Sequence, residues 1–149
     1  MQASGNCLNL IKECEGFRSA PYRCPAGVPT IGYGSTRYAD GRPVKLTDPP
    51  ITEEVAREIM TATLVQYEAA VNRYATVPLN QNQFDALVDF AYNAGAQNLR
   101  TSTLLKLLNQ SKFEEAAAEF GKWVYGGGKK LGGLVKRREM ERHLFSQSG

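Results

Sequence analysis

Three side chains near the start of the chain have the chemistry for an acid-catalysed hydrolysis. Glu15 offers a carboxyl group, Cys24 a thiol nine residues later, and Thr30 a hydroxyl six residues beyond that. An acid-catalysed hydrolysis needs a proton donor for the leaving group and a polar group that can hold the attacking water. Glu15 is therefore the candidate acid, and Thr30 is the candidate group for holding the water.

A helix over residues 7–15 should position the carboxyl group. Leu8, Ile11 and Glu15 recur at helical spacing, which predicts that they share the buried side of the helix. A carboxyl group at the end of an apolar face is poorly solvated, and this favours its protonated form. Gly16 is expected to end the helix, because glycine is common directly after the last helical residue.

The thiol and the hydroxyl should lie on a small β-hairpin. Residues 17–46 are rich in Gly, Pro, Tyr and Thr, with short β-capable stretches around 18–22 and 30–33. Pro25-Ala26-Gly27 between them suits a hairpin turn. We expect a small sheet beside the first helix, followed by an irregular segment over residues 38–50.

A long helix should begin after Thr52, which can cap it, and its first turn carries Glu53 and Glu54. It must end before Pro78. Its expected apolar positions are Val55, Ile59, Met60, Thr63, Leu64, Tyr67 and Val71. Such a helix is long enough to join two lobes, and a cleft between lobes is a natural place for a polymeric substrate.

The sequence after Pro78 is predicted to be mainly helical. Asn80 and Gln83 form a predicted capping box before an apolar stretch that Gly95 closes. Further helices are expected over residues 103–109, over 113–123 after a Ser111 and Glu114 cap, and over 134–145. A glycine loop over residues 126–128 should separate the last two.

The segment from Glu15 to Thr30 resembles the catalytic segment of phage lysozymes of glycoside hydrolase family 24. The family pattern is Glu, eight residues, Asp or Cys, five residues, Thr, and the chain fits it. Weaker similarities cover residues 90–95, 101–105, 123–128 and 133–139. The resemblance implies an α+β lysozyme-like fold in one domain, with a small β-containing lobe over about 15–52 and a connecting helix over about 53–77. A helical lobe would comprise about 78–149 and the N-terminal helix.

That resemblance also implies an activity and a set of residues. The expected reaction is hydrolysis of the β-1,4 bond between N-acetylmuramic acid and N-acetylglucosamine in bacterial peptidoglycan. Glu15, Cys24 and Thr30 would be catalytic, with Cys24 in a supporting polar or electrostatic role where many relatives have Asp. Arg138 would pair with Glu15. The expected substrate-binding residues are Tyr33, Thr36, Tyr92, Asn93 and Thr103.

Two other functions stay open at this point. A lytic transglycosylase needs only one acid/base carboxyl group, which Cys24 in place of a second carboxylate would suit. A non-catalytic wall-binding module is the second alternative. Individual residues also have structural interpretations, since Tyr92 and Trp123 could be core aromatics and Ser102 or Thr103 could cap a helix.

Composition restricts the cofactors. The 149 residues contain one histidine, His143, and no cysteine pair with metal-ligand spacing, so neither a metal nor a cofactor is expected. The net charge is +3, with basic residues gathered near the end of the chain, where they suit a solvated helix face or an anionic wall. We expect no nucleic-acid partner, because no basic-aromatic motif is present. These basic residues are Lys129, Lys130, Lys136, Arg137, Arg138 and Arg142.

The sequence also bears on location. It has no apolar run of membrane-spanning length and no signal-peptide layout at its start. We therefore expect a monomer made in the cytoplasm without membrane insertion. The resemblance implies action on the wall in the periplasm after release through a separate holin.

Overall fold

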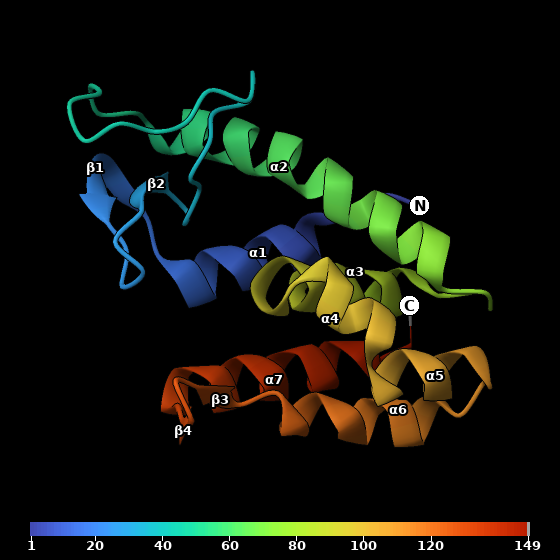
Figure 1. Cartoon of the computed structure of the whole chain (residues 1–149). Helices are drawn as coiled ribbons and strands as arrows, with labels where there is room; N and C mark the ends of the chain where they lie inside the picture. Colours follow the sequence, from blue (N-terminus) through green and yellow to red (C-terminus); the bar gives the residue numbers. More distant parts are fainter. Residues whose placement is uncertain (149) are drawn as a thin grey trace. The chain divides into compact units, whose positions relative to one another are not determined.

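The computed structural model describes residues 1–148, and its helices and short strands confirm the α+β class. The chain divides into two compact units, one formed by residues 11–65 and the other by residues 1–10 with the chain from Gln66 onward. The predicted limits of the lobes stay a prediction. The elements in chain order are α1 (Gly5–Glu15), β1 (Arg18–Arg23), β2 (Pro29–Gly32), α2 (Glu53–Tyr74), α3 (Gln81–Ala94), α4 (Ala96–Thr101), α5 (Thr103–Asn109), α6 (Phe113–Glu119), a 3₁₀ turn (Phe120–Lys122), β3 (Tyr125–Gly126), β4 (Lys129–Lys130) and α7 (Gly132–Phe145) (Figure 1).

In the smaller unit, the β1–β2 hairpin packs against the start of α2. Gly32 has a φ of +67°, and a Cβ atom there would stand 3.0 Å from the Cβ of Ala56. The predicted cap of α2 is present, because the backbone N–H of Val55 donates to Thr52 Oγ1 at 3.2 Å. The core of this unit comprises Ile11, Ile31, Tyr33, Val44, Ala56, Ile59, Met60 and Leu64.

Two of the predicted buried positions are wrong. Val55 on α2 is 37 % exposed, and the adjacent Ala56 is buried in its place. On α1, Leu8 is only half-buried, and the fully buried positions are Cys7, Leu10 and Ile11. The other main predicted positions are confirmed, since Ile11, Ile59, Met60, Leu64 and Val71 are buried.

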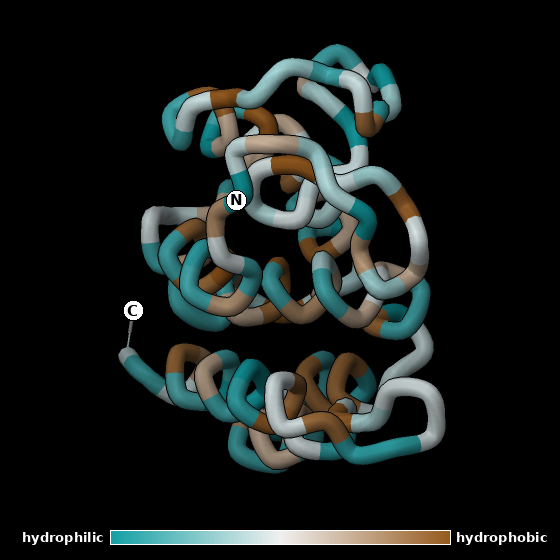
Figure 2. Tube along the Cα trace, turned by 90° about the vertical axis from the view of Figure 1, so that its left-hand side faces the viewer, coloured by the Kyte–Doolittle hydropathy of each residue, from teal (hydrophilic) through white to brown (hydrophobic). Residues whose placement is uncertain are grey.

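The larger unit is built around α3, which lies beside α7 (Figure 1). Its capping box is confirmed: Asn80 accepts from the backbone N–H of Gln83, and the Gln83 side chain accepts from that of Asn80. Along its helices, hydrophobic residues recur between hydrophilic ones, as expected for helices that bury one side (Figure 2). Phe84, Phe90, Leu104 and Phe120 are fully buried in this unit.

Three local predictions for the larger unit need correction. Residue Ser111 does not cap α6, which begins after Lys112 without a side-chain cap, and Ser111 itself has a φ of 61°. The predicted helix over 113–123 gives way to a 3₁₀ turn after Glu119. The glycine loop over 126–128 belongs to a hairpin in which Tyr125 pairs with Lys130 and Gly126 with Lys129.

Candidate functional site

Glu15 is the last residue of α1 and lies at the edge of its buried face. Ile11, one turn earlier, is completely buried, whereas Glu15 is half-buried. Gly16 ends the helix as predicted: it has a φ of 70°, and its N–H donates to the carbonyl of Lys12 at 3.0 Å. The carboxyl group is therefore held at a fixed helix end and keeps access to the surface.

The β1–β2 hairpin places Cys24 and Thr30 together at its turn. Strand register sets Tyr22 opposite Thr30, and Cys24 directly follows β1. The turn is closed by two backbone bonds, from Cys24 N–H to the Val28 carbonyl at 3.0 Å and from Gly27 N–H to the Cys24 carbonyl at 2.7 Å. Gly27 has a φ of 81°, which glycine adopts without strain.

Hydrogen-bond donors surround the sulfur of Cys24. The pKa of the half-buried thiol is lowered, first by the backbone N–H of Val28 and also by that of Ala26 and by the Thr30 hydroxyl, against the opposing effect of desolvation. Donors that stabilise a thiolate favour its negative charge. The hydrogen bonds at this turn therefore favour the thiolate form of Cys24.

Thr30 is 2 % exposed, and its hydroxyl donates to the Val28 carbonyl at 2.9 Å. A hydroxyl has a single proton and two acceptor lone pairs. The proton can go either to that carbonyl or to the sulfur of Cys24, while the remaining lone pair can accept from a water. The Thr30 hydroxyl is therefore placed so that it contributes to the lowered pKa of the Cys24 thiol.

Tyr22 belongs to the same site, although the sequence prediction missed it. The guanidinium of Arg18 lies 4.3 Å from the centre of the Tyr22 ring. Burial raises the pKa of Tyr22, the charge of Arg18 opposes this, and the negative charges of Glu15 and Cys24 raise it further. Glu15, Tyr22 and Cys24 therefore share one electrostatic environment. The sequence signal that could have identified Tyr22 was its position two residues before Cys24 in a predicted strand.

Tyr33 occupies a supporting position behind this site. It is 2 % exposed, and its hydroxyl donates to Glu53 Oε1 at 2.6 Å. Lys12 Nζ lies 3.4 Å from the same oxygen, and the Phe17 ring packs 5.6 Å from that of Tyr33. Burial, followed by the hydrogen bond to Glu53, raises the pKa of Tyr33 to about 12. These contacts tie α1, β2 and α2 together, and a substrate contact by Tyr33 stays a prediction.

Thr36 is exposed, and its backbone carbonyl accepts from the N–H of Val44 at 3.0 Å. Its side chain faces outward from the loop that follows β2. The predicted role of Thr36 in substrate binding is compatible with this exposure and stays a prediction.

In the larger unit, Asn93 and Arg138 meet at a cavity of about 280 Å³. An Nη atom of Arg138 donates to Asn93 Oδ1 at 2.5 Å, and Asn98 Nδ2 donates to the carbonyl of Ala94. Trp123 and Tyr125 supply aromatic walls. The residues lining this cavity are Asn93, Ala94, Asn98, Trp123, Tyr125, Leu134 and Arg138.

The other two predicted binding residues of this unit lie elsewhere. Tyr92 is half-buried and packs edge-on against Tyr67, with ring centroids 5.5 Å apart. Thr103 is the exposed first residue of α5, and the adjacent Ser102 caps that helix by accepting from the N–H of Leu105 at 3.0 Å. Neither lines the cavity around Asn93, and their roles toward a substrate stay predictions.

Arg137 and Arg138 are buried, which corrects their assignment to a basic surface. They are 4 % and 1 % exposed. Arg137 makes two hydrogen bonds to Asp89, at 3.0 and 2.7 Å, and Arg138 Nε lies 2.9 Å from Glu141 Oε1. Desolvation, followed by the nearby Asp89 carboxylate, raises the pKa of Glu141 well above its ordinary value. The predicted pairing of Arg138 with Glu15 stays a prediction.

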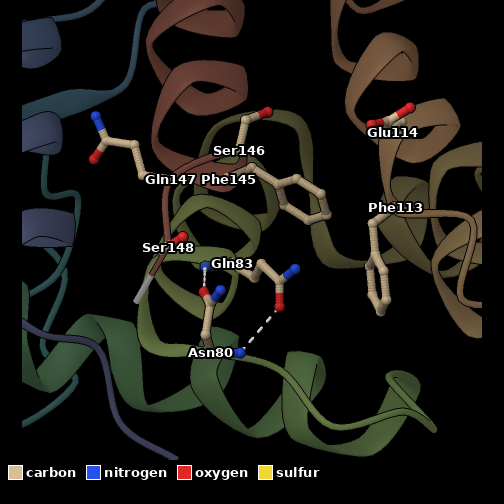
Figure 3. Close-up of a pocket in the computed structure, with 8 residues that line it drawn as sticks. All are labelled: Asn80, Gln83, Phe113, Glu114, Phe145, Ser146, Gln147 and Ser148. Atoms are coloured by element: carbon tan, nitrogen blue, oxygen red, sulfur yellow. Dashed lines mark hydrogen bonds between the residues drawn. The ribbon is translucent and has the colours of Figure 1, made fainter.

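A second cavity lies in the larger unit, away from all predicted site residues. Its volume is about 330 Å³, and the Asn80–Gln83 capping box, Phe113 and the end of α7 surround it (Figure 3). The hydrogen-bonding groups of the capping box are already satisfied by each other. Nothing in this cavity resembles a catalytic arrangement.

Neither a metal site nor a membrane span is apparent in the described part of the chain. Residues 1–148 contain no group of three or more His, Cys, Asp or Glu side chains placed to hold a metal ion. Among the helices of the same residues, none is sufficiently long and apolar to cross a membrane.

Comparisons with known proteins give consistent matches over nearly the whole chain. A family model described as phage lysozyme matches residues 12–141. The endolysin of Acyrthosiphon pisum secondary endosymbiont phage 1 is 40% identical over 152 residues, covering 99% of this chain and 100% of the relative. The endolysin of Bacillus phage B103 is 43% identical over 150 residues, but these span 97% of this chain and only 54% of that relative.

A solved structure agrees with the sequence matches. The endolysin from Escherichia coli O157:H7 phage FAHEc1 superposes with a TM-score of 0.90 at 39% identity, covering 98% of this chain and 94% of that one. The expected lysozyme-like fold is confirmed by this similarity.

Proposed function

This chain belongs to the phage lysozyme family, and on that premise we propose that it is an endolysin that hydrolyses bacterial peptidoglycan. The bond cleaved is the β-1,4 linkage between N-acetylmuramic acid and N-acetylglucosamine. The observation that carries this assignment is the hairpin turn that joins Cys24 to Thr30 in the electrostatic environment of Glu15 and Tyr22. Family membership supports the reaction, and the contacts at this turn support assigning the catalytic residues to it.

Glu15 donates the proton to the leaving glycosidic oxygen. Its place at the edge of the buried face of α1 suits this role, because the carboxyl group is partly shielded from water yet accessible. The fixed end of α1 at Gly16 holds the carboxyl group in one position. The attacking water releases its second proton to the solvent, and the Glu15 carboxylate takes up a proton from the solvent after bond cleavage, so the reaction consumes one water in net terms.

Thr30 holds the attacking water through its free lone pair. The Thr30 hydroxyl donates its proton to the Val28 carbonyl or to the sulfur of Cys24. Its oxygen can therefore only accept a hydrogen bond from the water. Cys24 has a supporting polar or electrostatic role toward the positive charge that develops on the sugar ring, because the hydrogen bonds to its sulfur favour the thiolate form.

The same chemistry sets the expected product. Water attack leaves a reducing N-acetylmuramic acid end, whereas a lytic transglycosylase would leave an anhydro end lighter by one water. Because we assign the attacking water to the Thr30 hydroxyl, hydrolysis is the favoured reaction. Mass spectrometry of the fragments released from purified peptidoglycan tests this. Reducing ends support a hydrolase, anhydro ends support a transglycosylase, and no fragments support a binding module.

We extend the proposal to the setting in which the enzyme acts. The protein is synthesised in the host cytoplasm, works as a monomer, and reaches the periplasmic wall after a separate holin permeabilises the membrane. Expression in a bacterium with and without a holin, followed by the optical density of the culture, tests the dependence. Lysis without the holin would overturn this part of the proposal.

A further inference from the structure

The β3–β4 hairpin is a short projection whose backbone is tightly specified. Its two-residue loop, Gly127-Gly128, has φ values of 58° and 79°, the combination that a type I′ turn requires. At Gly126 a Cβ atom would come within 2.6 Å of Leu131 Cδ1, so Leu131 packs directly over that glycine. The hairpin therefore presents its side chains in a defined arrangement.

The exposed side chains of this hairpin are basic and aromatic. Tyr125 is 65% exposed and faces Lys130 across the strand pair, while Lys129 is also exposed. Directly opposed residues of an antiparallel pair project on the same side of the sheet. Tyr125 and Lys130 thus form one contact surface, with Lys129 beside it.

The stretch of sequence that contains the hairpin, between Glu119 and Glu139, is basic. From Phe120 to Arg138 the sequence has six basic residues and no acidic one. Burial against Asp89 and Glu141 removes Arg137 and Arg138 from the surface, and Lys122 is paired with Glu119 at 2.5 Å. None of the ion pairs within residues 1–148 involves Lys129 or Lys130, so their ammonium groups remain available to an external anion.

We propose that the β3–β4 hairpin holds peptidoglycan through the carboxylates of its peptide stems, with Lys129 and Lys130 as the cationic contacts and Tyr125 as an aromatic one. The inference rests on the proposed function, because it takes peptidoglycan as the substrate. Lysine ammonium groups pair with carboxylates, and an exposed aromatic ring packs on the sugar or peptide beside them. An anionic membrane is a poorer match, because Tyr125 and Leu131 are too small an apolar surface for insertion.

The test compares initial rates on native peptidoglycan and on peptidoglycan whose carboxylates have been converted to amides. The variants are the wild type, the double variant Lys129→Gln/Lys130→Gln, and a matched control, Lys45→Gln/Lys112→Gln, which removes the same charge from exposed positions elsewhere. At low salt the hairpin variant should raise KM for native peptidoglycan roughly two- to tenfold, with kcat unchanged. On the amidated polymer, the KM of the hairpin variant should equal that of the wild type.

Each other outcome contradicts the inference in its own way. An equal rise in KM for the control variant would show an effect of net charge alone. An unchanged KM for native peptidoglycan, combined with weaker binding of the hairpin variant to anionic lipid vesicles, would assign the hairpin to a membrane surface. Failure of the wild type to release fragments from either polymer would overturn the proposed function itself, which separates the two failures.

Discussion

Tyr22 lies directly across the β1–β2 ladder from Thr30, so the aromatic ring and the hydroxyl are held at one point of the hairpin. Cys24 follows at the turn and shares the hydroxyl of Thr30, while the charges of Glu15 and Cys24 both act on Tyr22. The hairpin register therefore determines which side chains meet at the turn. A one-residue slip would turn each side chain of β2 to the opposite face.

The pKa of the Cys24 thiol should depend on Thr30. Because the hydroxyl contributes to lowering the pKa of Cys24, Thr30→Val should raise that pKa and shift thiol alkylation to higher pH. Mass spectrometry of tryptic peptides after iodoacetamide treatment over a pH series measures Cys24 separately from Cys14 and Cys7. The same midpoint in both proteins would show that Thr30 does not influence the sulfur.

Replacing the thiol by a carboxylate should preserve catalysis. Cys24→Asp keeps a negative charge in the turn, whereas Cys24→Ala removes it, so the first variant should equal or exceed wild-type rates and the second should lose activity. Turbidity clearance of purified walls compares the three proteins. Full activity in Cys24→Ala would show that the sulfur carries no electrostatic role.

Much of this site could be predicted from local signals in the sequence. The end of α1 at Gly16, the Asn80 capping box and the Thr52 cap each depend on residues within a few positions of one another, and all three are confirmed. The hairpin strands were likewise indicated by short β-capable stretches on either side of Pro25-Ala26-Gly27.

Local signals could not identify interaction partners that are distant in the sequence. Arg137 and Asp89 are 48 residues apart in sequence, and no local pattern indicates that the pair is buried. A run of basic residues on a helix normally indicates a solvated face, so Arg137 and Arg138 were assigned to the surface. Their burial depends on how α7 packs against α3.

Stability should depend on pH through Glu141. Its folded-state pKa is raised above the ordinary 4.5, so below that value both states are protonated and no difference arises. As the pH rises, the unfolded chain loses this proton first, and folding stability falls until the folded-state pKa is reached. Glu141→Gln should remove this decline.

Urea unfolding of both proteins at pH 4.5, 6 and 7.5 measures the difference. The wild type should lose stability relative to Glu141→Gln as the pH rises, by up to about 1.4 kcal/mol per pH unit. The relevant quantity is the change in this difference with pH, since the substitution also alters the contact with Arg138 at every pH. Parallel pH profiles would contradict the raised pKa.

Gly32 should tolerate no larger residue. Gly32→Ala places a Cβ atom 3.0 Å from that of Ala56 on a backbone with φ +67°, so it should cost about 2–3 kcal/mol. The control is Gly41→Ala, where φ is +89° and nothing lies within 4 Å, so only the backbone cost of about 1 kcal/mol remains. Thermal unfolding measures the loss of stability in each variant. Equal losses would show that the structure accommodates the contact with Ala56 without an energetic cost.

The most direct test of the central claim is the rate of fragment release from purified peptidoglycan by Glu15→Gln. Its matched control is Glu13→Gln, an exposed glutamate on the same helix. With unfolding temperatures close to that of the wild type, Glu15→Gln should lose at least about a hundredfold in rate, the usual contribution of a general acid. Glu13→Gln should keep wild-type rates. Wild-type release by a folded Glu15→Gln protein would contradict the assignment of Glu15 as the acid.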